Sequence, residues 1–139
     1  MTPTVVLDTN IVLDLWLYDD AATPALREAL AQGEVRWVST PVMREELTRV
    51  LAYPHIVQRL ARDARTTDAV LQPFDQYAHI EAVANKAPYT CKDPDDQKFI
   101  DLAVTHTATL VSKDKAVLAM RNRLARLGVP VLKVWSRAD

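Results

Sequence analysis

Glycine is scarce in this sequence, with only Gly33 and Gly128 among 139 residues. The phosphate-binding loops of P-loop NTPases and of dinucleotide-binding domains need several glycines, because their backbone approaches the phosphate closely. The two glycines here stand far apart, so neither kind of loop can be built from this sequence. The commonest nucleotide-binding sites of α/β proteins are therefore excluded.

Cysteine is nearly absent as well, since Cys91 is the single one. One cysteine cannot form an internal disulfide, which fits the reducing cytoplasm, and it cannot build a cysteine-based zinc site. The three histidines, His55, His79 and His106, lie far apart without the spacing of zinc ligands. We interpret Cys91 as a small buried side chain that fills space in the core.

Long apolar runs and an excess of charge of one sign are also missing. No stretch approaches the roughly 18 apolar residues of a membrane-spanning helix. The first ten residues, MTPTVVLDTN, lack the basic and apolar regions of a signal peptide. The formal net charge is −1, so binding of nucleic acid would require local positive charge. We expect a cytoplasmic protein with one domain over residues 1–139 and no membrane contact.

What the sequence does contain is an alternation of short β-branched runs with longer amphipathic stretches. Strands are expected at 4–7, 35–39, 109–112 and 130–134. Helices are expected at 10–16, 24–31, 41–53, from 93 onward and at 115–127, with residues 56–84 helical but interrupted. Strands separated by helices predict an α/β domain with a central parallel sheet of about four to five strands and helices on both faces.

Acidic residues follow the expected strands or begin the helices beside them. They are Asp8, Glu45, Glu46, Asp93, Asp95, Asp96 and Asp114. The carboxyl ends of parallel strands meet at one edge of a sheet, where ligands of α/β proteins bind. Crowded carboxylates repel one another, and a cation relieves that repulsion. Oxygen ligands alone favour Mg²⁺ or Mn²⁺, and such ions can assist phosphodiester hydrolysis.

Each acid taken singly also has a simpler structural explanation. Asp8, Asp93 and Asp114 could each cap the helix that follows, because aspartate is a common N-cap residue. Glu45 and Glu46 could lie on a solvated helix face. That explanation stays open, but it must account for three elements that each begin with an aspartate near the end of a strand.

Longer segments resemble the signatures of PIN-domain nucleases in their order and spacing. They are VVLDTNIVLDLW (5–16), VSTPVMREELTRVL (38–51) and KDPDDQKFIDLAVTHTATLVSKDKAVL (92–118), and the resemblance extends from Val5 to Val134. It implies a PIN-like fold and an endoribonuclease that uses one or two Mg²⁺ or Mn²⁺ ions to hydrolyse RNA. The segments are most similar to the toxin components of bacterial toxin–antitoxin pairs, which implies an antitoxin protein as the partner.

The resemblance also implies which residues form the site. The acids that would hold metal and carry catalysis are Asp8, Glu46, Asp96 and Asp114. The residues that match supporting positions are Asn10, Ser112 and the auxiliary acid Asp93. The chain departs from the family at Lys113, where many relatives have glycine, and this puts the local turn before Asp114 in question.

Four lysines flank the acids in the sequence: Lys92, Lys98, Lys113 and Lys115. They could form a rim that binds RNA phosphates and supplies the local positive charge. They could equally be surface lysines that offset the neighbouring aspartates, and the sequence does not decide between the two.

Three other functions compete with the ribonuclease hypothesis. A structure-specific PIN-fold DNA nuclease is disfavoured because the chain has no room for extra DNA-gripping segments. A PIN module that only binds RNA or a partner is disfavoured because all four acids are present. Haloacid dehalogenase-like phosphoryl transfer requires a second aspartate two residues after Asp8, and that position is Asn10. The sequence leaves the oligomeric state open, a homodimer included.

Overall fold

The computed structural model describes residues 2–137 and contains one five-stranded parallel sheet. Its strands are β1 (Thr4–Leu7), β2 (Arg36–Ser39), β3 (Ala78–Ile80), β4 (Thr109–Val111) and β5 (Val131–Leu132). The strand order is β3-β2-β1-β4-β5, and every pairing is parallel. The chain therefore moves outward from β1 in both directions, which makes the carboxyl ends of β1 and β4 a topological switch point where ligands bind.

The helices connect these strands in sequence order. They are α1 (Thr9–Trp16), α2 (Pro24–Ala31), α3 (Pro41–Leu51), α4 (Pro54–Arg62), α5 (Asp68–Tyr77), the 3₁₀ turn η1 (Pro94–Asp96), α6 (Gln97–His106), α7 (Lys115–Leu118) and α8 (Arg121–Ala125). Proline occupies the first position of α2, α3 and α4, where no backbone hydrogen bond is lost. Among residues 2–137, no helix combines the length and the apolar character needed to cross a membrane.

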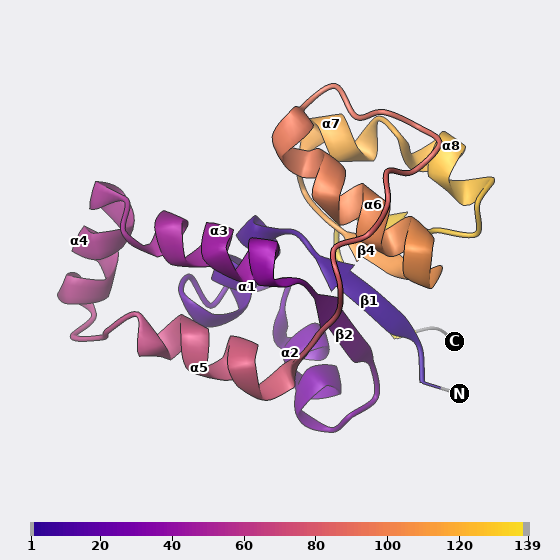
Figure 1. The fold of residues 1–139 in the computed structure, drawn as a ribbon. Coiled ribbons are helices and arrows are strands. Elements are labelled where there is room, and N and C mark those ends of the chain that lie inside the picture. Colours follow the sequence, from indigo (N-terminus) through magenta and orange to yellow (C-terminus); the bar gives the residue numbers. More distant parts are fainter. Residues whose placement is uncertain (1, 138–139) are drawn as a thin grey trace.

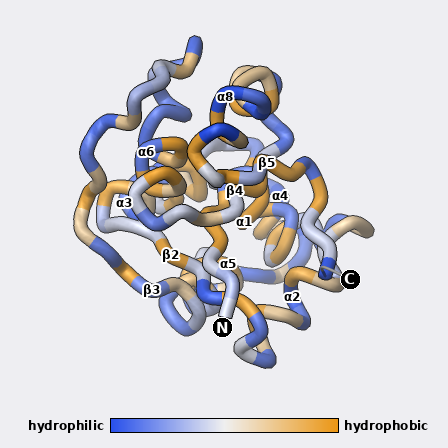
Figure 2. Tube along the Cα trace, turned by 90° about the vertical axis from the view of Figure 1, so that its right-hand side faces the viewer, coloured by the Kyte–Doolittle hydropathy of each residue, from blue (hydrophilic) through white to orange (hydrophobic). Residues whose placement is uncertain are grey.

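Two hydrophobic clusters cover the two faces of the sheet, so the expected layering is confirmed (Figure 1). Alternate residues of β1 point to opposite faces: Val5 and Leu7 pack with α1, α2, α4 and α5, while Val6 packs with α6, α7 and α8. In Figure 2 the hydrophobic stretches gather mainly in the middle of the molecule, and the hydrophilic stretches lie mostly outside. This packing holds the carboxyl end of β1 between the two groups of helices.

The structure corrects the expected elements in two places. Residues 56–84 contain the edge strand β3 as well as helices, and its three residues show no clear alternation because none of them is buried. The single helix expected at 115–127 is two short helices separated at Ala119 and Met120. Met120, at the break, and Leu124 in α8 are both buried in the core.

Candidate metal-binding site

The carboxylate of Asp8 belongs to the N-cap residue of α1, directly after β1. Its Oδ1 accepts a hydrogen bond from the backbone N–H of Asn10 (3.1 Å), which caps α1, and its Oδ2 accepts one from Ser112 Oγ (2.7 Å). Asp8 is only 4% exposed, and burial raises the pKa of its carboxyl. The hydrogen bonds from Ser112 and Asn10 oppose that rise, while the charges of Asp114 and Glu46 add to it.

Ser112 forms hydrogen bonds with both Asp8 and Asp114. It is completely buried at the end of β4, and its Oγ accepts a hydrogen bond from the backbone N–H of Asp114 (3.1 Å) while donating to Asp8. Asp114 in turn caps α7 by accepting from the backbone N–H of Ala116 (2.8 Å). One hydroxyl group therefore links the carboxylate of Asp8, after β1, to the backbone of Asp114, after β4.

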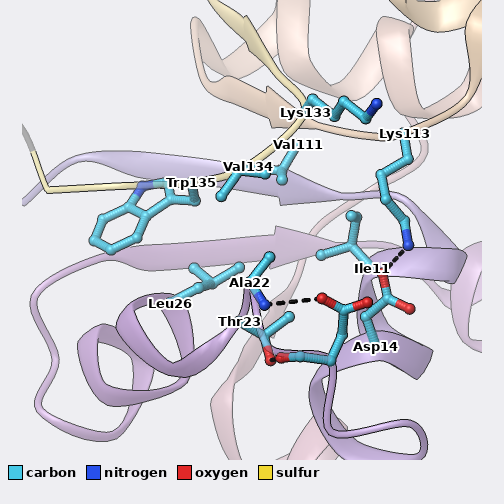
Figure 3. A pocket seen from close by; sticks show the side chains of 11 residues that line it. Ile11, Asp14, Ala22, Thr23, Leu26, Val111, Lys113, Lys133, Val134 and Trp135 are labelled. Carbon is cyan, nitrogen blue, oxygen red and sulfur yellow. Dashed lines mark hydrogen bonds and ion pairs between the residues drawn. The ribbon is translucent and has the colours of Figure 1, made fainter.

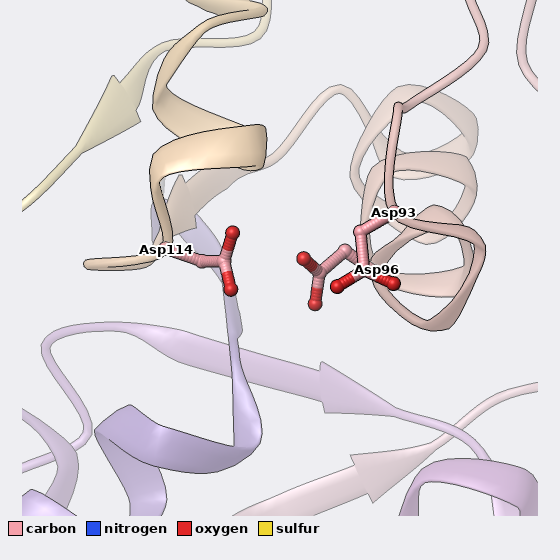
Figure 4. Close-up of side chains that lie close together, drawn as sticks. All are labelled: Asp93, Asp96 and Asp114. Atoms are coloured by element: carbon pink, nitrogen blue, oxygen red, sulfur yellow. The ribbon is translucent and has the colours of Figure 1, made fainter.

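Asp93 and Asp96 approach Asp114 from the other side, at the turn before α6 (Figure 4). One carboxylate oxygen from each of the three residues lies within 4.8 Å of the others. Asp96 is 8% exposed, and its buried Oδ2 has no hydrogen-bond partner within residues 2–137. Burial, followed by the charges of Asp8, Asp114 and Asp93, raises the pKa of Asp96 to about 7.

Glu46 completes the set from α3. Its Oε2 accepts a hydrogen bond from Thr9 Oγ1 (2.5 Å), and its Oε1 lies 2.7 Å from Lys98 Nζ. Its neighbour Glu45 is exposed. The structure thus places Glu46, and not Glu45, on the face of α3 that meets α1 and the first turn of α6.

A comparison with known protein families identifies the family of this chain. The PIN domain family model matches residues 4–116, which is most of the chain. The chain belongs to the PIN-domain family. This PIN domain is 21% identical over 122 residues to an uncharacterized protein of Methanocaldococcus jannaschii, covering 85% of this chain and 75% of that protein. A solved PilT N-terminus domain protein from Sulfolobus solfataricus is similar with a TM-score of 0.45 and 19% identity, covering 93% of this chain and 85% of that one.

The four acids expected to hold metal, Asp8, Glu46, Asp96 and Asp114, all lie at this edge of the PIN domain, whereas Glu45 and Asp95 are exposed. Asp93, assigned an auxiliary role, belongs to the same cluster as Asp96 and Asp114, in which one carboxylate oxygen of each residue lies within 4.8 Å of the others. Asn10 contributes its backbone N–H, and the residue is exposed. Thr9 is an additional residue of the site: it stands inside the Asp-Thr-Asn motif, which by itself indicated no role for it, and its hydroxyl donates to Glu46.

The four lysines separate into two groups. Lys92 and Lys115 are exposed next to the acids, and their contact with RNA stays a prediction. Lys98 pairs with Glu46, and Lys113 Nζ lies 2.5 Å from Asp14 Oδ2.

The side chain of Lys113 therefore crosses to α1, where it lines a small pocket with Asp14 on one side and Trp135 on the other (Figure 3). The lysine at the usual glycine position still allows Asp114 to reach Asp93 and Asp96.

The residues present fit a hard divalent cation. All five acidic side chains offer oxygen ligands, which Mg²⁺ and Mn²⁺ prefer. The buried Oδ2 of Asp96 lacks a hydrogen-bond partner within the described chain, and an orphaned buried carboxylate oxygen is costly unless something binds it. The raised pKa of Asp96 shows the same unrelieved negative charge. Asp96, Asp114 and Asp93 are positioned to hold such an ion, with Asp8 behind them.

Proposed function

We propose that this PIN domain is a metal-dependent endoribonuclease that hydrolyses phosphodiester bonds in RNA. The observation that carries the proposal is the buried, unpartnered oxygen of Asp96 among the other carboxylates. A bound Mg²⁺ or Mn²⁺ ion would supply neutralisation of the phosphodiester charge and activation of a water molecule. The PIN-domain fold and the four acids at the positions of the family motifs support this activity.

The protein's own residues prepare the site for that chemistry. Ser112 and the backbone of Asn10 hold Asp8 in one orientation, so the carboxylate needs little rearrangement to bind a cation. Asp96 has a pKa of about 7, so it carries a proton for part of the time at neutral pH and must release it when a cation binds. The exposed Lys92 and Lys115 would attract the RNA backbone toward the acids.

Cleavage of labelled oligonucleotides tests the activity. With Mn²⁺, we expect the wild-type protein to cut single-stranded RNA but not DNA of the same sequence, and excess EDTA to stop the cutting. Asp114→Asn should lower the rate by at least about 100-fold, because it removes one of the negative charges that would hold the metal ion beside the reacting phosphate. Asparagine caps helices as well as aspartate does, so α7 should survive the change.

The other outcomes separate the competing functions. Equal cutting of DNA would indicate a DNA nuclease, and RNA binding without cutting would indicate a PIN module without catalysis. Cutting that continues in excess EDTA would contradict metal dependence.

We further propose that the protein acts in the cytoplasm as the toxin of a toxin–antitoxin pair. An unrestrained ribonuclease would harm its host, so a partner protein should cover the acids. A basic side chain of an antitoxin would complement the charge of Asp93, Asp96 and Asp114. Induced expression of the wild type alone should arrest bacterial growth, and Asp114→Asn should not. Equal growth of the two strains at equal protein levels would contradict the toxin role.

A further inference from the structure

Lys98 and Glu46 form a largely buried ion pair inside the acidic site. Lys98 stands in the first turn of α6, two residues after Asp96, and reaches across to α3. The Nζ–Oε1 distance is 2.7 Å, and the side chains of Lys98 and Glu46 are 23% and 18% exposed. Of the predicted metal-binding acids, Glu46 is the one with a lysine at ion-pair distance within residues 2–137.

Further contacts hold the ammonium group of Lys98 where it is. It donates a hydrogen bond to the backbone carbonyl of Asp95, and it lies 5.0 Å from the centre of the Phe99 ring, a favourable cation–π position. Moving the side chain away would break all three contacts at once. It would also leave Glu46 unpaired in a site that is already crowded with negative charge.

Glu46 and Asp96 differ in whether their carboxylate oxygens have partners. Both oxygens of Glu46 have a donor, Thr9 on one and Lys98 on the other. Asp96 instead keeps a buried oxygen without a hydrogen-bond partner in the described chain, and its carboxylate lies in the cluster with Asp93 and Asp114. The negative charge around Asp96 is therefore the charge that still needs a cation, because the charge of Glu46 is already balanced by Lys98.

We propose that Lys98 is a resident second cation, which neutralises Glu46 in place of a second metal ion, so that the site binds a single divalent ion beside Asp96 and Asp114. The inference rests on the proposed function in that it takes these acids as the metal site. An ammonium group has three N–H donors, and Glu46 and the Asp95 carbonyl occupy two of them. The third remains for a phosphate oxygen of the substrate.

Counting bound Mn²⁺ ions tests this assignment directly. Titration of the purified full chain at neutral pH, followed by calorimetry and by the electron paramagnetic resonance signal of free Mn²⁺, gives the number of ions and their Kd. We expect one ion per wild-type chain. Lys98→Met keeps the apolar stem and removes the charge, so it should bind two ions, with the first bound roughly tenfold more tightly. Lys98→Arg should bind one.

Two control variants distinguish the replacement of the Lys98 ammonium by a metal ion from a general effect of removing positive charge near the acids. Lys92→Met removes a positive charge near the acids without touching Glu46, so it should bind one ion with a Kd within about threefold of the wild type. The double variant Lys98→Met/Glu46→Gln removes both members of the ion pair and should return to one ion. Because the double variant has no charge at either position, it also shows whether an effect of Lys98→Met comes from misfolding caused by an unpaired Glu46.

Different results would overturn the two proposals. Two ions on the wild-type chain would show that Lys98 gives way to metal and would overturn the inference. So would a Lys98→Met protein with one ion and an unchanged Kd. Binding of no ion by the wild type would instead contradict the metal-dependent function proposed above.

Discussion

The Asp96→Asn variant should lose at least about 100-fold in RNA cleavage and, without metal, should be more stable than the wild type by about 1 kcal/mol. The two effects have one cause. Asp96 is buried against Asp8, Asp114 and Asp93, so its negative charge is unfavourable in the folded protein unless a cation is present. The substitution removes that charge and supplies an amide N–H₂ that can donate to the neighbouring carboxylate of Asp114.

The matched control is Asp95→Asn, one residue earlier in the same 3₁₀ turn. Asp95 is exposed and is not part of the cluster formed by Asp93, Asp96 and Asp114. Its substitution should leave the rate of RNA cleavage unchanged. It should change the free energy of unfolding by no more than about 0.5 kcal/mol. If Asp96 were an ordinary residue at a helix start, Asp96→Asn would be neutral or destabilising, because that position prefers negative charge. That result, or wild-type cleavage, would remove Asp96 from the site.

The sequence could predict the elements that place the acids because their signals are local. The apolar run of β1 ends directly before Asp8, and Thr40 with Pro41 starts α3, as expected. Parallel pairing then brings Asp8 and Asp114 to one edge of the sheet without any knowledge of side-chain contacts. The edge strand β3 gave no such signal, because a three-residue strand with no buried residue has no apolar pattern.

The finer geometry depends on contacts that no local pattern encodes. Thr9 and Lys98 meet Glu46 across three different helices, so only the packed structure shows that both oxygens of Glu46 are bound. The closeness of Asp93 to Asp96 depends on the 3₁₀ turn η1, in which residues three apart lie on the same side. An ordinary helix start would place residues three apart on one side as well, so the spacing predicts this alignment, whereas the approach of both residues to Asp114 is a tertiary contact that no local pattern encodes.

Without metal, the wild-type protein should lose stability as the pH rises from about 5 to about 8. The carboxyl of Asp96 keeps its proton up to a pH of about 7 in the folded protein, whereas in the unfolded chain it ionises near its ordinary value of 3.8. The folded state therefore holds more protons in this range, and raising the pH favours unfolding. Burial shifts the pKa of Asp8 in the same direction.

A divalent cation should reverse this loss. It binds the ionised carboxylates of the folded protein, and a ligand at about 100 times its Kd stabilises the folded state by about 2.7 kcal/mol. For a chain of this size that corresponds to a rise in Tm of roughly 5–10 °C. The rise should be much smaller near pH 5, where the proton on Asp96 competes with the metal.

Thermal unfolding of the wild type and Asp96→Asn, each at about pH 5.5 and about pH 8 with and without Mg²⁺, tests most directly whether these acids form a cation site. Comparing the two proteins cancels the titration of groups that do not interact with Asp96, so the difference reports on the acidic cluster. We expect Mg²⁺ to raise the Tm of the wild type at the higher pH and to raise that of Asp96→Asn much less, and we expect the metal-free wild type to show the steeper loss with pH. An unchanged wild-type Tm with Mg²⁺ at the higher pH, together with a destabilised Asp96→Asn, would contradict the site.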